Sequence, residues 1–288
     1  MPKIRTADGV SLYYEEAGAG TPVVFVHEFA GDYRTWEPQM RRFTRSHRCV
    51  TYSQRGYPPS DVPDDPTRYG QDIARSDVIA LMDALGINKA HVVGHSMGAY
   101  MAVHVGLHHP DRCISVAAAG CGWGSLPDPA QRAAMRKVAL ETAAMFIEKG
   151  MAEAAKIYGD GQMRQTHKHK DPRGFAEFMH MLSEHSPQGH ALTMTQLQAK
   201  RPNLWDLADD LKKFAVPLLI IVGDEDESCL DGSVFLKRMA PTAGLLVVPR
   251  SSHNITSEEP AIFNAALADL FTAAEAGRWM SHRASAQV

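Results

Sequence analysis

One serine of this chain lies between two glycines, in the run Gly94-His95-Ser96-Met97-Gly98. A short apolar segment precedes the run, and a helix-forming segment follows it. The Gly-x-Ser-x-Gly pattern is typical of a sharp strand-to-helix turn that presents the serine hydroxyl in strained backbone geometry. The helix that follows would direct free N–H groups toward negative charge that develops nearby. The pattern therefore predicts that Ser96 is the nucleophile of an acyl transfer.

A serine hydroxyl needs a base to accept its proton, and that base needs an acid to orient it. The base candidate is His253, which follows the apolar run 245–249. The acid candidates are Asp224 and Asp226, which follow the apolar run 216–223. Both loops come directly after strand candidates, as the serine does, and the carboxyl ends of parallel strands meet at one edge of a sheet. The chain order serine, aspartate, histidine occurs in one class of hydrolases.

The elements that must position these residues alternate along the chain. Short apolar or alternating runs predict strands at 11–16, 22–27, 49–52, 113–119, 216–223 and 245–249, and a further strand that ends at Gly94. Helical spacing predicts helices at 36–43, 73–85, 97–109 and 260–274. This alternation indicates an α/β fold with a doubly wound, mostly parallel sheet.

The rhythm changes in the middle of the chain. From about residue 127 to residue 211 the sequence is helix-forming and rich in Ala, Met and Glu, with no strand candidate. We therefore expect a helical cap inserted after the sixth strand. The predicted division is a core formed by 1–121 and 213–276, a cap at 122–212, and a loosely held tail at 277–288.

Composition excludes several classes of protein. The 288 residues are 44% hydrophobic and 22% charged, which is ordinary for a globular protein, and the net charge of -3 gives no basic character to attract nucleic acid. No apolar run is long enough to span a membrane, and the N-terminus lacks a secretory signal, so we expect a cytoplasmic location. Four cysteines without CxxC spacing indicate reduced thiols rather than a zinc site or a disulfide framework. The expected partner is a small-molecule substrate, and a homodimer stays open.

These features together resemble the α/β-hydrolase family, in its capped serine hydrolase or esterase type. The resemblance extends from Asp8 through the final helix. In that family the acid follows its strand in a Gly-x-x-Asp pattern, which implies Asp226 rather than Asp224 as the acid. The histidine of the family usually follows a small residue, as His253 follows Ser252 here.

The chain departs from the family pattern at one loop. The usual His-Gly after the second of these strands is replaced by His27-Glu28-Phe29. The resemblance implies an oxyanion hole formed by the backbone N–H groups of Phe29 and Met97. A carboxylate aimed at that hole would oppose the developing oxyanion, so we expect Glu28 to point away or to pair with a cation. A role for Glu28 in binding the substrate or positioning water stays open. The family's Arg-Gly turn has a counterpart in the loop 54–57.

Other candidate residues have simpler interpretations. His95 and His91 are expected to be structural, and the chelate-like pair His167 and His169 is expected in a solvated loop, so no metal is assigned. Trp123, at the start of the cap, is the aromatic residue expected in the substrate pocket. The methionines of the cap are expected to form its adaptable apolar underside: Met135, Met145, Met151, Met163, Met179, Met181 and Met194.

The resemblance implies a cofactor-free serine hydrolase that cleaves a carboxylic ester of a small to medium apolar substrate through an acyl-enzyme. In this family the same machinery also serves lactones, carbon–carbon bonds next to ketones, and peracid formation. Haloalkane dehalogenases and epoxide hydrolases of this fold have aspartate at the nucleophile position, and Ser96 argues against both. A different class stays open, because some members of the fold are small-molecule receptors that retain the triad.

Overall fold

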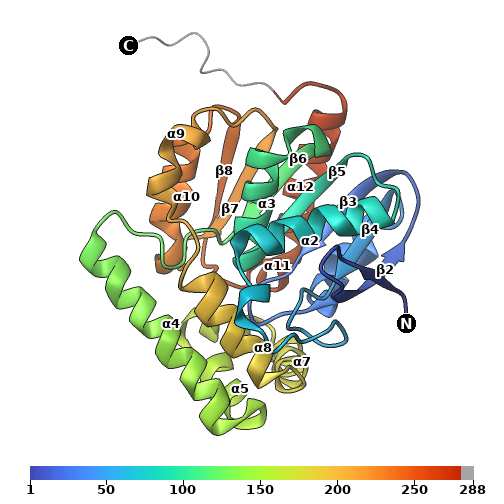
Figure 1. Cartoon of the computed structure of the whole chain (residues 1–288). Helices are drawn as coiled ribbons and strands as arrows, with labels where there is room; N and C mark the ends of the chain where they lie inside the picture. The colour runs from blue at the N-terminus through green and yellow to red at the C-terminus, as the bar shows by residue number, and fades with distance from the viewer. Residues whose placement is uncertain (280–288) are drawn as a thin grey trace.

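The computed structural model describes residues 1–279, which surround one central sheet of eight strands (Figure 1). The strands, in their order across the sheet, are β1 (Lys3–Arg5), β2 (Ser11–Ala17), β4 (His47–Tyr52), β3 (Thr21–Val26), β5 (Ala90–His95), β6 (Cys113–Ala119), β7 (Leu218–Gly223) and β8 (Ala243–Val248). The β1–β2 and β2–β4 pairs are antiparallel, and every other neighbouring pair is parallel. The predicted doubly wound, mostly parallel sheet is confirmed.

Helices cover both faces of the sheet, which explains why its central strands are continuously apolar. One face packs on α2 (Gln71–Ala84), α3 (Met97–His108) and α10 (Glu227–Met239). The other face packs on α1 (Glu37–Phe43) and α12 (Pro260–Glu275), and the short helix α11 (Ile255–Glu258) precedes α12. Strands β3, β5 and β7 therefore lie in a dry interior, and the polar loops that follow them emerge at one edge.

The cap follows β6 and lies beyond that edge of the sheet (Figure 1). Its helices are α4 (Pro129–Lys149), α5 (Met151–Gly159), α6 (Gln165–Lys170), α7 (Pro172–Ser183), α8 (Pro187–Leu192) and α9 (Ala208–Leu211), with a tight turn at Gln162–Arg164 and a π-helical stretch at Thr193–Gln198. All of them lie inside the predicted cap range 122–212. Buried methionines of the cap include Met151, Met181 and Met194.

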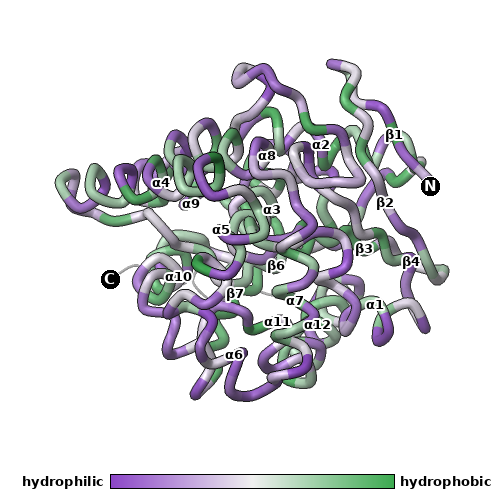
Figure 2. Tube along the Cα trace, turned by 90° about the horizontal axis from the view of Figure 1, so that it is seen from below, coloured by the Kyte–Doolittle hydropathy of each residue, from purple (hydrophilic) through white to green (hydrophobic). Residues whose placement is uncertain are grey.

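The longest cap helix, α4, buries one small apolar face and leaves Val138, Leu140 and Ile147 exposed. Hydrophobic and hydrophilic residues alternate along its turns in Figure 2. Its buried side chains are Ala139, Ala143 and Phe146, which are three and four residues apart and so share one face. Asp128 begins the helix, because its side chain accepts a hydrogen bond from the N–H of Ala130. The cap therefore buries its own small apolar core against the loops of the sheet.

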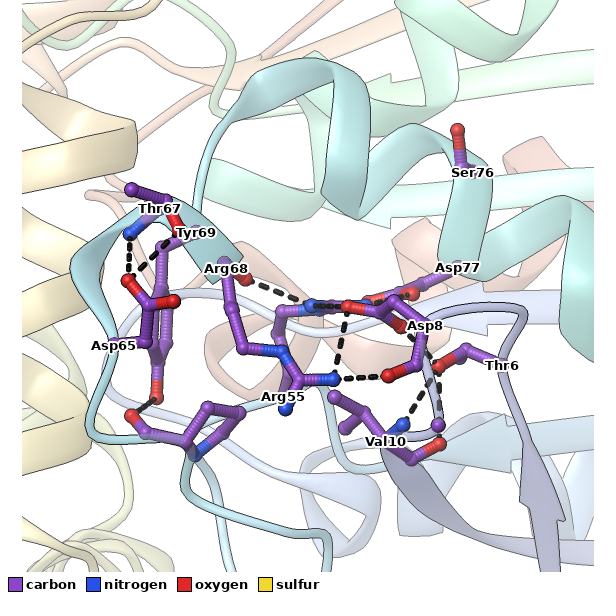
Figure 3. Close-up of polar contacts among 12 residues, drawn as sticks. Thr6, Asp8, Val10, Arg55, Asp65, Thr67, Arg68, Tyr69, Ser76 and Asp77 are labelled. Atoms are coloured by element: carbon purple, nitrogen blue, oxygen red, sulfur yellow. Dashed lines mark hydrogen bonds and ion pairs between the residues drawn. The ribbon is translucent and has the colours of Figure 1, made fainter.

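A buried arginine fixes the loop between β4 and α2 (Figure 3). Arg55 is 4% exposed and donates to both oxygens of Asp77 on α2, at 2.6 Å each. Its remaining nitrogen donates to Asp8 at 2.9 Å and to the carbonyl of Arg68 at 2.7 Å. The guanidinium is thus saturated with acceptors, and the loop that it holds continues to Gly56, whose backbone touches Gly189 of the cap.

Two details differ from the sequence predictions. The first strand, β1, was not predicted, because its 3 residues are too few to show an alternation of apolar and polar side chains. The tail was expected to be loosely held from residue 277, but Trp279 donates to the carbonyl of Thr242 at 2.7 Å and packs against Gly244. That expectation is wrong for 277–279, and its remainder, 280–288, lies outside the described residues. Within residues 1–279, no helix is both long and apolar enough to cross a membrane.

Candidate active site

Ser96 lies at the turn between β5 and α3 in a backbone conformation that residues other than glycine rarely adopt, with φ 53° and ψ -110°. The flanking glycines explain how the turn can be so tight. A Cβ at Gly94 would lie 2.0 Å from the carbonyl oxygen of Gly98, and a Cβ at Gly98 would lie 2.0 Å from that of Val26. The strained serine is held in place because the chain is packed backbone against backbone.

The serine, the histidine and one aspartate form a continuous hydrogen-bonded chain. The Ser96 hydroxyl lies 2.8 Å from Nε2 of His253, and Nδ1 of His253 lies 2.7 Å from Oδ2 of Asp226. With Nδ1–H donating to the carboxylate, Nε2 is free to accept the serine proton. All three side chains are buried, since the serine is 8% exposed and the other two are 2% exposed.

The pKa values of His253 and Asp226 are shifted in opposite directions. Burial lowers the pKa of His253, but the adjacent Asp226 carboxylate outweighs burial, so the pKa of His253 lies above its usual 6.5. Burial raises the pKa of Asp226, but His253 and the hydroxyl of Ser228 outweigh it, so the pKa of Asp226 lies below its usual value. The arrangement therefore favours an ionised aspartate and stabilises the imidazolium that would form during proton transfer.

The second acid candidate lies elsewhere. Asp224 is exposed, and its carboxylate accepts from the backbone N–H of Ser251 at 3.3 Å. Asp226 is buried against Gly120, whose φ of 56° turns the chain after β6. A Cβ at Gly120 would lie 3.3 Å from the His253 ring and 3.4 Å from the Asp226 carboxylate. Only Asp226 is therefore placed to contact the histidine.

The two N–H groups expected to form the oxyanion hole belong to buried residues, Phe29 at 2% and Met97 at 1% exposure. Within residues 1–279, neither N–H donates to a backbone acceptor in a turn or loop. The ring of Phe29 is enclosed by aromatic rings of the cap: its centroid lies 5.9 Å from that of Phe146, 5.5 Å from that of Tyr158 and 4.7 Å from that of His190. The cap thus forms an aromatic wall directly over this loop.

Glu28 is buried at 2% exposure and pairs with a cation, as one of the two expectations from the sequence required. Its Oε2 accepts from Nη2 of Arg164, a cap residue that is 3% exposed, at 2.9 Å. Burial raises the pKa of Glu28, but Arg164, His95, His253 and His167 together outweigh burial and keep the pKa below its usual value. The carboxylate is therefore an anion in the interior, with its partner on the other side of the boundary between core and cap.

Two of the expected structural histidines are buried without exposure to solvent. Nε2 of His95 lies 2.7 Å from the carbonyl oxygen of His253, and burial lowers the pKa of His95 to about 4. His91 lies between Ser115 and Glu275, at 2.7 Å and 3.2 Å. His95 thus contacts the backbone of the loop that carries His253, whereas His91 lies at the other end of β5.

The structure corrects the interpretation of His167. The expected solvated loop is the helix α6, and His167 on its inner face is 2% exposed, with Nδ1 3.1 Å from the side-chain amide of Asn254. His169 is exposed and bonds to the carbonyl of Gln165. Since the two rings face different surroundings, they do not form a chelate. The neighbouring charge of Lys168 suggested that His167 is exposed to solvent. In the helix, however, Lys168 lies on the polar face and His167 on the buried face.

Trp123 lies at the base of the cap. It lines a cavity of about 490 Å³ with Arg132, Arg136 and Arg201, and Ser96 is not among the residues that line this cavity. The Arg201 guanidinium carbon lies 5.9 Å from the centroid of the Trp123 ring. The expected place of Trp123 in the substrate pocket therefore stays a prediction.

Two groups of side chains in the described residues have ligand atoms close enough together for a metal. One is Asp226, Cys229 and His253, which are the proposed catalytic groups and their neighbour. The other is His47, His91 and Glu275, at the opposite end of the sheet. In the first group, the hydrogen bonds of His253 to its two neighbours already use both ring nitrogens. In this arrangement His253 therefore has no ring nitrogen left for a metal.

Comparison with known proteins identifies the family of this chain. Residues 23–266 match the family model described as the alpha/beta hydrolase family. The RutD protein of Caulobacter vibrioides (strain NA1000 / CB15N), named as a carbamate hydrolase, is 41% identical over 130 residues, which are 44% of this chain and only 46% of that protein. The 3-oxoadipate enol-lactonase 2 of Acinetobacter baylyi is 26% identical over 266 residues, which are 91% of this chain and 93% of that protein.

A solved structure extends the comparison to the fold. The crystal structure of the enol-lactonase from Burkholderia xenovorans LB400 superposes with a TM-score of 0.81 at 22% identity, and the match covers 94% of this chain and all of that one (100%). The sheet order, the cap and the family match together define the class. This chain belongs to the alpha/beta hydrolase family.

Proposed function

We propose that this chain is a cofactor-free serine hydrolase that cleaves a carboxylic ester of a small to medium apolar substrate. The observation that carries the proposal is the buried hydrogen-bonded chain from Ser96 through His253 to Asp226, with contacts of 2.8 Å and 2.7 Å. A nucleophile within hydrogen-bond reach of a base, which is in turn oriented by an acid, is the arrangement that covalent acyl transfer needs.

The first half of the reaction forms an acyl-enzyme. The Ser96 oxygen attacks the ester carbonyl carbon while His253 accepts the hydroxyl proton. The carbonyl oxygen becomes an oxyanion, and the N–H groups of Phe29 and Met97 stabilise it. The tetrahedral intermediate collapses, the bond to the alcohol oxygen breaks, and His253 returns its proton to the leaving alcohol. Asp226 holds the imidazole in the tautomer that this sequence requires.

The second half releases the acid. A water molecule attacks the acyl carbon while His253 accepts one of its protons, and a second oxyanion forms in the same hole. This intermediate breaks the bond to Ser96, and the proton on His253 passes to the serine oxygen. The product is a carboxylic acid, and the enzyme returns to its starting state.

Lactone hydrolysis is the second candidate, because one of the relatives that match nearly the whole chain is named as an enol-lactonase. A lactone is a cyclic ester, so the same residues act and the alcohol stays attached to the acyl group. Carbamate hydrolysis has comparable support, since the RutD protein of Caulobacter sp. (strain K31), named for it, is 29% identical over 91% of this chain and 95% of that protein. Cleavage of a carbon–carbon bond next to a ketone is a further use of the same triad.

The test is turnover of a set of short aryl esters, lactones and β-diketones by the wild-type chain and by Ser96→Ala. We expect turnover of at least one ester or lactone, and a loss of about 10⁶-fold in Ser96→Ala with folding intact. An alanine variant that keeps a tenth of the activity would show that Ser96 is not the nucleophile. A wild-type chain that binds these compounds without turning any of them over would instead favour the receptor class.

A further inference from the structure

The segment of the cap around α6 lies on the loops that carry the proposed catalytic residues. Ser252 donates to the carbonyl of Met163 at 3.0 Å, and Asn254 lies 3.1 Å from Nδ1 of His167. These two core residues flank His253 on both sides. Thr166 donates to Glu225, the residue before the proposed acid, at 2.8 Å. The cap therefore contacts the catalytic loops through side chains rather than through apolar surface alone.

At the centre of this contact lies the pair of Arg164 and Glu28. The Arg164 guanidinium carbon lies 5.0 Å from the ring centroid of Tyr158 and 5.2 Å from that of Phe178, and both rings belong to the cap. Its Nη2 makes the 2.9 Å contact with Glu28, while its Nε is buried without a hydrogen-bond partner among the described residues. The arginine is thus held by the cap, and its charge is directed at a carboxylate of the core.

Glu28 is linked in turn to the catalytic histidine. Its other oxygen, Oε1, lies 4.0 Å from Nδ1 of His95, and Nε2 of His95 lies 2.7 Å from the carbonyl oxygen of His253. Glu28 also directly precedes Phe29, whose N–H is the proposed oxyanion donor. A change in the charge or place of this carboxylate would therefore affect both the base and the hole.

The charges near His253 have opposing effects on the pKa of that histidine. Burial lowers the pKa of His253 and Asp226 raises it; Glu28 acts in the same direction as Asp226, and Arg164 acts against them. The charged or titratable groups around Glu28 are Arg164, His95, His253 and His167. Those around His253 also include Asp226 and Cys229. Without Arg164, the negative charge of Glu28 beside the proposed oxyanion hole would have no cationic partner.

Building on the serine hydrolase function above, we propose that Arg164 is a positioning residue that the cap supplies to neutralise Glu28, so that the site reaches its working state only with the cap in place. With the cap seated, Glu28 is held toward Arg164 and away from the forming oxyanion. With the cap lifted, Glu28 is an unpaired anion next to the site, and the oxyanion forms less readily. The pair thus couples closure of the cap to chemistry.

The experiment compares Arg164→Met, Glu28→Gln and the double variant Glu28→Gln/Arg164→Met, with kcat and KM for one aryl ester measured across pH. Arg164→Met leaves an unpaired anion beside the forming oxyanion, so we expect it to lose about 30-fold in kcat/KM, mainly in kcat. Glu28→Gln leaves no anion there and should lose less than about fivefold. The double variant removes both charges and should recover to within about fivefold of wild type.

The pH profile gives a second readout that a purely structural role would not move. His253 must be neutral to accept the serine proton, so its pKa sets the acidic limb of kcat/KM. Arg164→Met leaves the anion and should move that limb up by about one pH unit, whereas Glu28→Gln leaves the cation and should move it down. The double variant should return the limb to the wild-type position.

The outcomes separate this inference from the proposed function. A double variant no more active than Arg164→Met, or a limb that fails to move in opposite directions in the two single variants, would overturn the role of Arg164. If Arg164→Met does not fold, the pH profile decides: the limb should move down in Glu28→Gln and return in the double variant. Ser96→Ala, assayed alongside, tests the nucleophile on its own: activity that survives in it would overturn the hydrolase mechanism instead.

Discussion

Two buried arginine–carboxylate pairs in this molecule differ in how completely they are satisfied. Arg55 and Asp77 lie within the core, joined by two contacts of 2.6 Å, and the other nitrogen of Arg55 has acceptors of its own. Arg164 and Glu28 join the cap to the core through one contact of 2.9 Å, and Nε of Arg164 has no partner among residues 1–279. Both pairs are almost fully buried.

The difference indicates what each pair does. A saturated, two-pronged pair within one layer fixes geometry, because every donor has an acceptor and the guanidinium cannot turn. A pair that joins the cap to the core, and in which one donor has no acceptor, can form only while the cap is packed on the core. The first pair is therefore expected to act on stability and the second on activity. Each prediction below tests one side of this contrast.

The largest expected effect is the loss of kcat when the proposed catalytic aspartate loses its charge. Asp226→Asn presents His253 with the wrong tautomer and should lower kcat by about 10⁴-fold, as expected when the acid of a triad becomes an amide. Asp224→Asn is the matched control, since that carboxylate is exposed, and it should change kcat by less than about threefold. Both variants are measured on one ester. The reverse ranking would assign the role of the acid to Asp224.

The next effect breaks the core pair. Arg55→Met leaves Asp77 buried without its partner and should lower the free energy of unfolding by about 3–5 kcal/mol. The kcat/KM of the molecules that remain folded should stay within about threefold of wild type, because Arg55 makes its contacts away from Ser96. Urea unfolding and active-site titration together give both numbers. A large loss of kcat/KM per active site, with unfolding unchanged, would reverse the contrast between the two pairs.

Local signals in the sequence were sufficient to predict the residues that form the hydrogen-bonded serine, histidine and aspartate. Ser96 is marked by glycines that the backbone packing requires, and Asp226 and His253 are placed by the strands that precede them. The sheet and the cap followed from the alternation of strands and helices. Asp226 was distinguished from Asp224 only through the resemblance to a family, because burial of one carboxylate and exposure of the other is decided by the turn after β7.

The contacts between cap and core could not be predicted in the same way. Arg164 lies in a polar, helix-forming stretch with no motif around it, and its partner Glu28 is more than a hundred residues earlier. The sequence suggested a cation for Glu28 but did not identify it. His167 was expected in solvent because Lys168 and Lys170 lie beside it in a polar stretch. Trp123 was chosen for its residue type and its place at the start of the cap. Each of these depends on how the cap seats on the sheet, which no local pattern encodes.

A smaller effect concerns the pH dependence of the wild-type enzyme. Burial opposes the charge of His253, but the carboxylate of Asp226 raises the pKa of that histidine above 6.5. Because His253 acts as a base only when neutral, kcat/KM should rise with pH through an apparent pKa above that value, and activity should fall as pH decreases through it. In Asp226→Asn the residual activity should rise through a lower pKa. A wild-type acidic limb well below pH 6 would contradict this arrangement of charges.

The smallest effect uses a third pair, which also joins core and cap but lies at the surface. Arg34 contacts Glu184 at 2.6 Å, and their side chains are 38% and 45% exposed. Solvent and salt screen such a pair, so Glu184→Gln should change the free energy of unfolding by less than about 1 kcal/mol. Arg34 also keeps its contact with Asp32 at 2.7 Å, so no buried charge is left unpaired.

Glu184→Gln should therefore leave kcat within about twofold of wild type and the acidic limb of kcat/KM in place, because a screened charge at the surface has little effect on His253. The comparison with Arg164→Met is informative because both variants remove one link between cap and core. If cutting the surface link moved the limb as far as cutting the buried one, loosening the cap would suffice to explain both results. The charge of Arg164 would then have no separate part in the site. A limb that moves only in the buried variant ties the effect to the charge beside Glu28.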